Sequence, residues 1–230
     1  SDCGQNGTQD AHEVAYCDPK GEYPNGHNFW TDPGVRARFI NVWKFVAARY
    51  RDTPYLGLFE PLPEPNPTSG TDADIRAFYD EVMMALRTVA PGVPFLLGPR
   101  SYGMKSVEAA YTSKWTDVVY TGNLFLRTSG THDENIAELS QRIQYLLDFK
   151  AAHQAPVFVQ QCGVQTGDDP DLSYLNAMLS LLNGKGLGYT YWEYRDTFNP
   201  NAYGVIYQDG HGGWIPKQAY LDTISGHLKA

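Results

Sequence analysis

The chain has 230 residues, 42% of them hydrophobic, which is enough to bury a substantial core as one domain. Its 18 basic and 26 acidic residues give a formal net charge of −8, with no run of Lys or Arg. Nucleic acid and anionic membrane surfaces are therefore poor partners. No apolar stretch approaches the roughly 20 residues that span a bilayer. The polar opening without a signal peptide fits a mature secreted protein or an excised fragment, and we expect secretion.

Apolar spacing, prolines and glycines predict an alternation of helices and short strands. Thr71 followed by Asp74 is a typical helix start, and Pro54 ends the helix before it. The expected helices cover residues 33–51, 71–86, 107–114, 136–146, 172–182 and 216–228, and the expected strands cover 55–59, 93–98, 117–121, 156–160 and 188–192.

Strands that alternate with helices at this spacing indicate an α/β fold with parallel βαβ connections. A doubly wound sheet has the same alternation, but no Gly-rich phosphate loop follows any strand. We therefore expect a (β/α) barrel of the TIM type, with about five strand–helix pairs visible. No linker or low-complexity segment divides the chain, so residues 1–230 are predicted to form one domain.

The residues that follow the predicted strands are rich in carboxylate, amide and aromatic groups. In a parallel barrel the reacting groups lie at these carboxyl ends. No Ser-His or Cys-His pairing accompanies them, and the three cysteines lack metal-ligand spacing. Cys3 and Cys17 are able to close a loop, which leaves Cys162 as an odd thiol. Carboxylates beside aromatic rings are typical of glycoside chemistry.

Four segments carry recognisable motifs in register, namely AARYRD at residues 47–52, LFEPLPEPN at 58–66, PVFVQQCG at 156–163 and GLGYTYW at 186–192. Together they resemble glycoside hydrolase family 5. Residues 58–66, LFEPLPEPN, are similar to the fourth-strand motif, which places the general acid/base at Glu64. Residues 156–163, PVFVQQCG, resemble the seventh-strand motif, which places the nucleophile at Gln161. Residues 186–192, GLGYTYW, resemble the eighth strand, and the resemblance implies that Trp192 forms the base of the sugar subsite. Residues 47–52, AARYRD, resemble the end of the third helix.

The departures from the family pattern concern the catalytic groups. Gln161 carries a neutral amide, a poor nucleophile for a retaining mechanism. Pro63 precedes Glu64 where the family has Asn, and the sixth-strand His-x-Tyr is replaced by Asn123-Leu124-Phe125. The sequence leaves open whether Gln161 is natural or introduced.

The resemblance begins after the family's third strand, so three strands are missing from the visible pattern. Either the chain is a fragment, or it is a truncated barrel with two open sheet edges. Exposed parallel edges invite pairing, and for a truncated barrel we expect a homo-oligomer that covers them.

The leading hypothesis is a protein that binds oligo- or polysaccharide of the β-glucan or mannan class and has impaired hydrolysis. Trp192 would stack a sugar, with further contacts from the side chains of Asn123, Phe125, Glu60 and Tyr102. The first alternative is an active hydrolase that uses Glu64 with Glu60 as a non-standard second carboxylate. The second is a non-catalytic interaction protein that kept only the fold. None of these requires a cofactor or a metal.

Overall fold

The computed structural model describes residues 29–30, 32–65, 71–100, 103–126, 130–196 and 199–228. Cys3, Cys17 and Tyr102 lie outside these ranges. The chain divides into two compact units, an N-terminal unit, Ser1–Tyr120, and a C-terminal unit, Thr121–Ala230. Each unit is described by itself, and the single domain remains a prediction.

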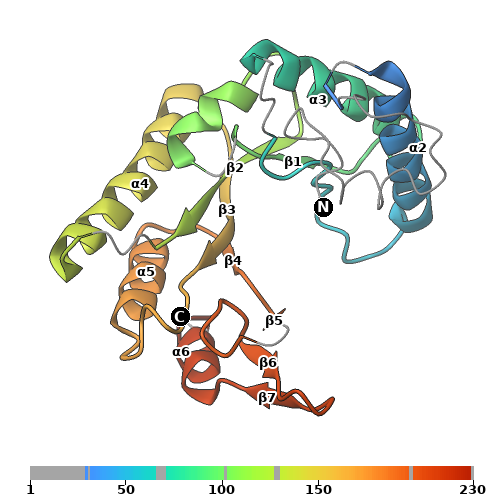
Figure 1. Cartoon of the computed structure of the whole chain (residues 1–230). Coiled ribbons are helices and arrows are strands. Elements are labelled where there is room, and N and C mark those ends of the chain that lie inside the picture. The colour runs from blue at the N-terminus through green and yellow to red at the C-terminus, as the bar shows by residue number, and fades with distance from the viewer. Residues whose placement is uncertain are drawn as a thin grey trace. The chain divides into compact units, whose positions relative to one another are not determined.

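Two neighbouring helices, α2 (Pro33–Tyr50) and α3 (Asp72–Arg87), belong to the N-terminal unit (Figure 1). The Asp32 side chain caps α2 by accepting hydrogen bonds from the backbone N–H groups of the first turn, and a capping box between Thr71 and Asp74 begins α3. Aromatic rings in edge-to-face contact pack the space beside these helices, namely Phe29, Trp30, Phe39 and Phe78.

The sheet of the N-terminal unit is small. Strand β1 (Phe95–Leu97) pairs in parallel with the first residues of β2 (Val118–Phe125). The strand expected at residues 55–59 is reduced to an isolated bridge between Phe59 and Phe95. Residues 54–55 form a turn and Pro61 follows closely, so little chain is left to extend the pairing. The weak helix expected at 107–114 is a 3-10 helix, η1 (Met104–Ala110).

In the C-terminal unit the strand order continues from β2 to β3 (Val157–Gly163) and β4 (Tyr189–Tyr191), and β3 and β4 are parallel. Helices α4 (His132–His153) and α5 (Ser173–Gly184) pack on each other. Their contact is apolar, as the predicted stripes require, and the buried side chains are Leu139, Ile143, Leu146, Leu175, Met178, Leu179 and Leu182.

A second sheet in the C-terminal unit was not predicted. Its strands are β5 (Arg195–Asp196), β6 (Ile206–Gln208) and β7 (Trp214–Pro216), and α6 (Gln218–Leu228) follows it. Strands of two or three residues are too short to show a periodic pattern, so tertiary pairing alone reveals them.

Candidate functional site

In the N-terminal unit a loop with two carboxyl groups follows the Phe59 bridge. Phe59 donates its backbone N–H to the Pro94 carbonyl at 2.9 Å, and its own carbonyl accepts from the Leu96 N–H at 2.8 Å. The next residues bend away from the sheet and carry Glu60 and Glu64. These side chains therefore follow the carboxyl end of a paired segment, where a parallel fold places its reactive groups.

The buried Tyr79 of α3 fixes the course of this loop. Its hydroxyl donates to the Leu62 carbonyl at 3.0 Å and lies 3.4 Å from the Gly98 carbonyl. Gly98 is also in close contact with the loop, because a Cβ at this position would lie 3.2 Å from the Glu64 backbone nitrogen. Glu64 adopts a left-handed conformation with φ of 49°, which is strained for a residue with a side chain. The surrounding contacts therefore hold the Glu64 backbone in place.

Glu60 lies half-buried at the start of this loop. Its Oε1 atom is fully buried and has no hydrogen-bond partner among the described residues. Burial, followed by the negative charge of Glu64, raises the pKa of Glu60 from its ordinary 4.5 to about 7. The chain bends at residues 61, 63 and 64, so Glu60 and Glu64 do not belong to one extended strand. Glu60 can therefore keep a proton close to neutral pH.

In the C-terminal unit two amide side chains meet on β2 and β3. The Asn123 Nδ2 atom donates to Gln161 Oε1 at 3.2 Å, and Asn123 is only 1% exposed. Both groups are neutral, and Gln161 lies near the end of its strand. An amide pair can donate to and accept from sugar hydroxyls, but its nitrogen and oxygen are poor nucleophiles.

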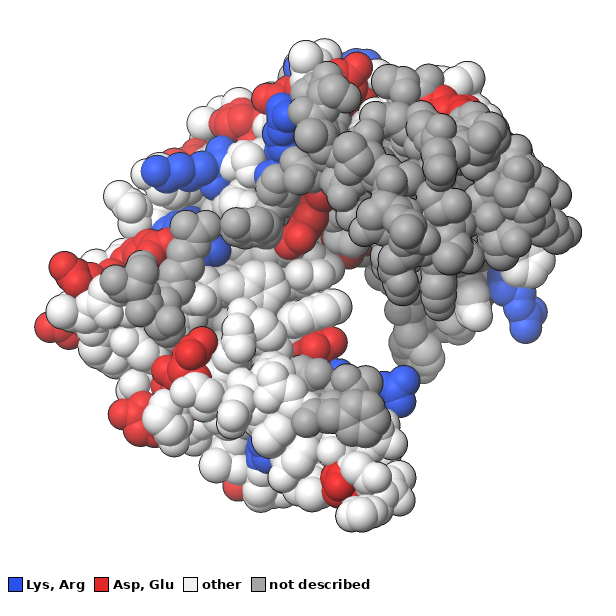
Figure 2. Space-filling model, in the orientation of Figure 1, with Lys and Arg blue, Asp and Glu red and all other residues white. Residues whose placement is uncertain are grey.

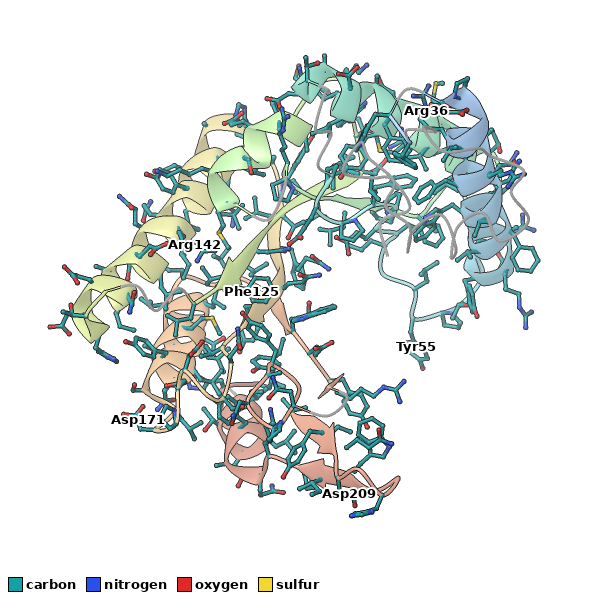
Figure 3. All side chains as sticks on the ribbon, in the orientation of Figure 1. Arg36, Tyr55, Phe125, Arg142, Asp171 and Asp209 are labelled. Carbon is teal, nitrogen blue, oxygen red and sulfur yellow. The ribbon has the colours of Figure 1, made fainter. Side chains whose placement is uncertain are left out.

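Arg142 of α4 holds the end of β2. Its guanidinium donates to the Asn123 carbonyl at 3.0 Å and to the Phe125 carbonyl at 2.5 Å (Figure 3). The Phe125 ring makes an edge contact with Tyr203, with the centroids 5.3 Å apart. Neither Arg142 nor Tyr203 was predicted from the sequence. No local signal marks them, because each is placed by packing between distant segments.

Trp192 directly follows β4 and is 41% exposed. Its backbone N–H donates to the Cys162 carbonyl at 2.8 Å. A Cβ on Gly163 would collide with the Trp192 carbonyl oxygen, so only glycine fits beside this backbone. The packing therefore fixes the Trp192 backbone while the indole remains available to a ligand.

Cys162 is a free, buried thiol. Burial raises its pKa to about 12, so the reactive thiolate is scarce at neutral pH.

Among the described residues no three His, Cys, Asp or Glu side chains form a group suited to a metal ion. On the face shown in Figure 2, basic side chains lie among acidic ones over the described part of the surface.

The sequence model of the family described as Cellulase (glycosyl hydrolase family 5) matches residues 10–197. The chain belongs to glycoside hydrolase family 5. The match begins upstream of the motifs that revealed the resemblance and includes the segments with Glu64, Gln161 and Trp192. No curated protein sequence matches the chain.

Solved structures of low sequence identity share the family 5 fold. Thermotoga maritima Cel5A, solved in complex with mannotriose, has a TM-score of 0.68 at 18% identity, over 85% of this chain and 68% of that one. The cellulose synthase subunit Z from Clostridioides difficile has a TM-score of 0.67 at 17% identity, over 85% and 70% of the two chains. Endo-glycoceramidase II from Rhodococcus sp. has a TM-score of 0.65 at 18% identity, over 84% and 48%.

These matches confirm the predicted α/β fold of the TIM-barrel type, present in part. The described residues contain four strands of the main sheet, and the similarity covers about two thirds of the length of Cel5A. The fold is that of a family of polysaccharide-acting glycoside hydrolases.

Proposed function

We propose that this protein binds a polysaccharide of the β-glucan or mannan class and hydrolyses it weakly or not at all. The observation that carries the proposal is the amide pair of Asn123 and Gln161, 3.2 Å apart, at the strand position where the family resemblance expects the nucleophile. A neutral amide there lacks the charge needed to form a glycosyl-enzyme intermediate. The substrate class follows from Cel5A, whose structures contain mannotriose and cellobiose.

The proposed roles follow the chemistry of each side chain. Glu64 is the acid/base group, and Trp192 stacks on the apolar face of a sugar ring. Asn123 and Gln161 exchange hydrogen bonds with hydroxyl groups. Phe125, Glu60 and Tyr102 complete the substrate contacts; Tyr102 enters on the family resemblance alone.

The first test is hydrolysis of soluble β-glucans and mannans by the wild type, Gln161→Glu and Gln141→Glu. Gln141 is exposed on α4, so its variant adds the same charge away from the strand ends. Only Gln161→Glu should gain activity. Cleavage by the wild type as fast as by Gln161→Glu would refute the loss of the nucleophile.

Binding of cello- and manno-oligosaccharides, measured by calorimetry, is the second arm. The wild type should bind one of the two series. Trp192→Ala should weaken that binding by about ten-fold, since burying the apolar face of a sugar ring against the indole contributes on the order of 1–2 kcal/mol. A wild type that neither binds nor cleaves these sugars would refute the proposed function.

One observation favours an active hydrolase as the second candidate. Glu60 is a buried carboxyl with a pKa of about 7, which suits a group that exchanges a proton near neutrality. If this candidate is right, the wild type hydrolyses the polysaccharide and the Glu60→Gln variant does not. The third candidate is a non-catalytic interaction protein that kept only the fold. Burial of Trp192 under the neighbouring loops would favour it, but Trp192 is exposed.

We also propose that copies of the chain associate. Val42 and Phe45 on α2 are exposed, the latter by 74%, and apolar side chains of this size favour burial. Sedimentation should detect an oligomer that Phe45→Lys weakens, and a wild-type monomer at high concentration would refute it.

Secretion is a further proposal, because the polymers that family 5 proteins act on are too large to enter a cell. Among the described helices none is long and apolar enough to cross a membrane. The protein should be found in the culture medium of its source, and retention inside the cells would refute secretion.

A further inference from the structure

The exposed aromatic side chains of the C-terminal unit gather around its small second sheet. Among the described residues of this unit, the large aromatic side chains that are exposed are Trp192, Tyr194 and Trp214. Trp214 begins β7, and the other two lie on the segment between β4 and β5 (Figure 1). Single exposed aromatic rings are ordinary, whereas a cluster of them indicates a surface that binds a ligand.

The strand register places Arg195 and Trp214 on one face of this sheet. Arg195 of β5 pairs with Ile206 of β6, and Trp214 of β7 pairs with Gln208, two residues farther along β6. Paired side chains point to the same face of a sheet, and side chains two residues apart in a strand do so too. All four side chains therefore lie on the same face.

The opposite face is turned toward the body of the unit. Tyr207, between Ile206 and Gln208, belongs to that face. The Lys217 ammonium lies 5.9 Å from the centroid of the Tyr207 ring and donates to the Ala202 carbonyl at 2.8 Å. The face that bears Trp214 is therefore the outer face of the sheet.

A cation holds the indole on this outer face. The Arg195 guanidinium carbon lies 5.3 Å from the centroid of the Trp214 ring, which is within the range of a cation–π contact. Trp214 is 42% exposed with the guanidinium in place. The guanidinium and the neighbouring Gln208 amide bring hydrogen-bonding groups beside a flat apolar ring. This combination suits a sugar, which has an apolar C–H face and hydroxyl groups at its rim.

The outer face is too small to bind a protein stably by itself. Its three strands are two or three residues long. With strands about 4.8 Å apart and a rise of about 3.3 Å per residue, the face covers on the order of 150 Å². A stable protein interface needs about 800 Å² on each partner. A single sugar ring, in contrast, fits on one indole.

The sheet is also joined directly to the segment that carries Trp192. The Val205 N–H, just before β6, donates to the Glu193 carbonyl at 3.0 Å. From the strand spacing and the rise per residue, the Cα atoms of Trp192 and Trp214 lie within about 25 Å of each other. Both indoles thus belong to one framework in the C-terminal unit, and a polysaccharide chain is long enough to reach both.

We propose that the outer face of the β5–β6–β7 sheet is a second sugar-binding surface, where Trp214 stacks on a sugar ring and Arg195 donates to its hydroxyl groups. The ligand is a neutral β-linked hexose polymer, one stretch of which lies at Trp192 and another at Trp214. Because the second contact is intramolecular, the polymer binds more tightly than either site alone. The choice of polymer rests on the proposed function, whereas the position of the surface rests on the sheet.

The first experiment follows the indole N–H signals by NMR while soluble β-glucan or mannan is added to the wild type. A Trp214→Phe variant identifies the Trp214 signal, and a Trp192→Phe variant identifies that of Trp192. Both signals should shift with one of the two polymers. Trp30 is buried in the N-terminal unit, so its signal should stay in place and serves as the internal control.

The second experiment compares the affinity of variants for the same polymer. Trp214→Ala should weaken binding by about ten-fold, because the loss of one of two linked contacts removes the gain from avidity. Tyr55→Ala, which removes an exposed ring from the N-terminal unit, should leave the affinity unchanged. If Trp214→Ala does not fold, Arg195→Gln keeps the indole and should weaken binding by about two- to five-fold.

The outcomes separate this surface from the proposed function. A Trp214 signal that stays in place while the Trp192 signal shifts would overturn the second surface and leave the proposed function intact. A shift of Trp214 alone would support the surface and count against the site at Trp192. If neither signal moves, both are refuted. A Trp214 signal that shifts with protein concentration in the absence of sugar would assign the outer face to a second copy of the chain, which also contradicts the proposal.

Discussion

The two units carry contrasting chemistry at their strand ends. In the N-terminal unit the loop after Phe59 holds two carboxyl groups, and burial raises the pKa of Glu60 to about 7. In the C-terminal unit the strand ends hold the neutral Asn123–Gln161 pair and the exposed indole of Trp192. The stability of the first region should depend on pH, and the stability of the second should depend on how closely its backbone is packed. The difference shows that strand ends within one family fold can carry side chains of contrasting charge and proton affinity.

The largest expected effect tests the packing of the C-terminal unit. Gly163→Ala places a methyl group against the Trp192 carbonyl and near the Tyr203 ring, so the backbone must shift. We expect a loss of about 3 kcal/mol in the free energy of unfolding, measured by urea denaturation. Gly184→Ala is the control, since nothing lies within 4 Å of a Cβ at that position. Equal stability of the two variants would show that the Trp192 backbone is not tightly held.

The second effect tests the pH response of the N-terminal unit. Because folding raises the pKa of Glu60 from 4.5 to about 7, the native state binds more protons than the unfolded state between these values. The stabilisation from protonated Glu60 is present in full below about pH 4.5 and is lost as pH rises to about 7, by about 2 kcal/mol.

Glu60→Gln should remove this part of the pH dependence, as measured by urea denaturation from pH 4 to 8. Glu108→Gln should leave it in place, since Glu108 is exposed. If the wild type and Glu60→Gln lose stability in parallel over this range, the carboxyl loop is not the pH-responsive region.

The smallest effect concerns the hydroxyl that holds the carboxyl loop. Tyr79→Phe removes the hydrogen bond to the Leu62 carbonyl within a fully buried site and leaves the ring in place. We expect a loss of about 1 kcal/mol in the free energy of unfolding. Tyr55→Phe is the control, because Tyr55 is 96% exposed (Figure 3). A Tyr79→Phe variant as stable as its control would mean that the loop is held by other contacts.

Part of the fold followed directly from the sequence. Helix α2 spans Pro33–Tyr50 against a prediction of 33–51, since Asp32, Pro33 and Pro54 are strong local boundary signals. The start of α3 was predicted for the same reason, by Thr71 and Asp74. The strand predicted at 55–59 is an isolated bridge at Phe59, because apolar composition does not specify the segment with which a strand pairs.

The candidate site was predictable only in part. Glu60, Gln161, Asn123, Phe125 and Trp192 lie at or after paired segments, as the strand-end argument requires, and their roles remain predictions. The supporting residues Tyr79, Arg142 and Tyr203 were missed. Tyr79 and Arg142 each donate a hydrogen bond to a backbone carbonyl at least 17 residues away in the chain, and the Tyr203 ring contacts the distant Phe125 ring. No local sequence pattern encodes such contacts.

By itself the sequence determined the α/β order and the family 5 resemblance, and it placed a neutral amide, Gln161, where that resemblance expects a carboxylate. These depend on residue identity and on spacing along the chain, both of which are local. Only the tertiary structure decided that Glu60 has a buried oxygen, that Asn123 reaches Gln161, and that Gly163 must remain glycine. Burial and close contact depend on neighbours brought together by folding, and they set the proton affinity and the packing of the same side chains.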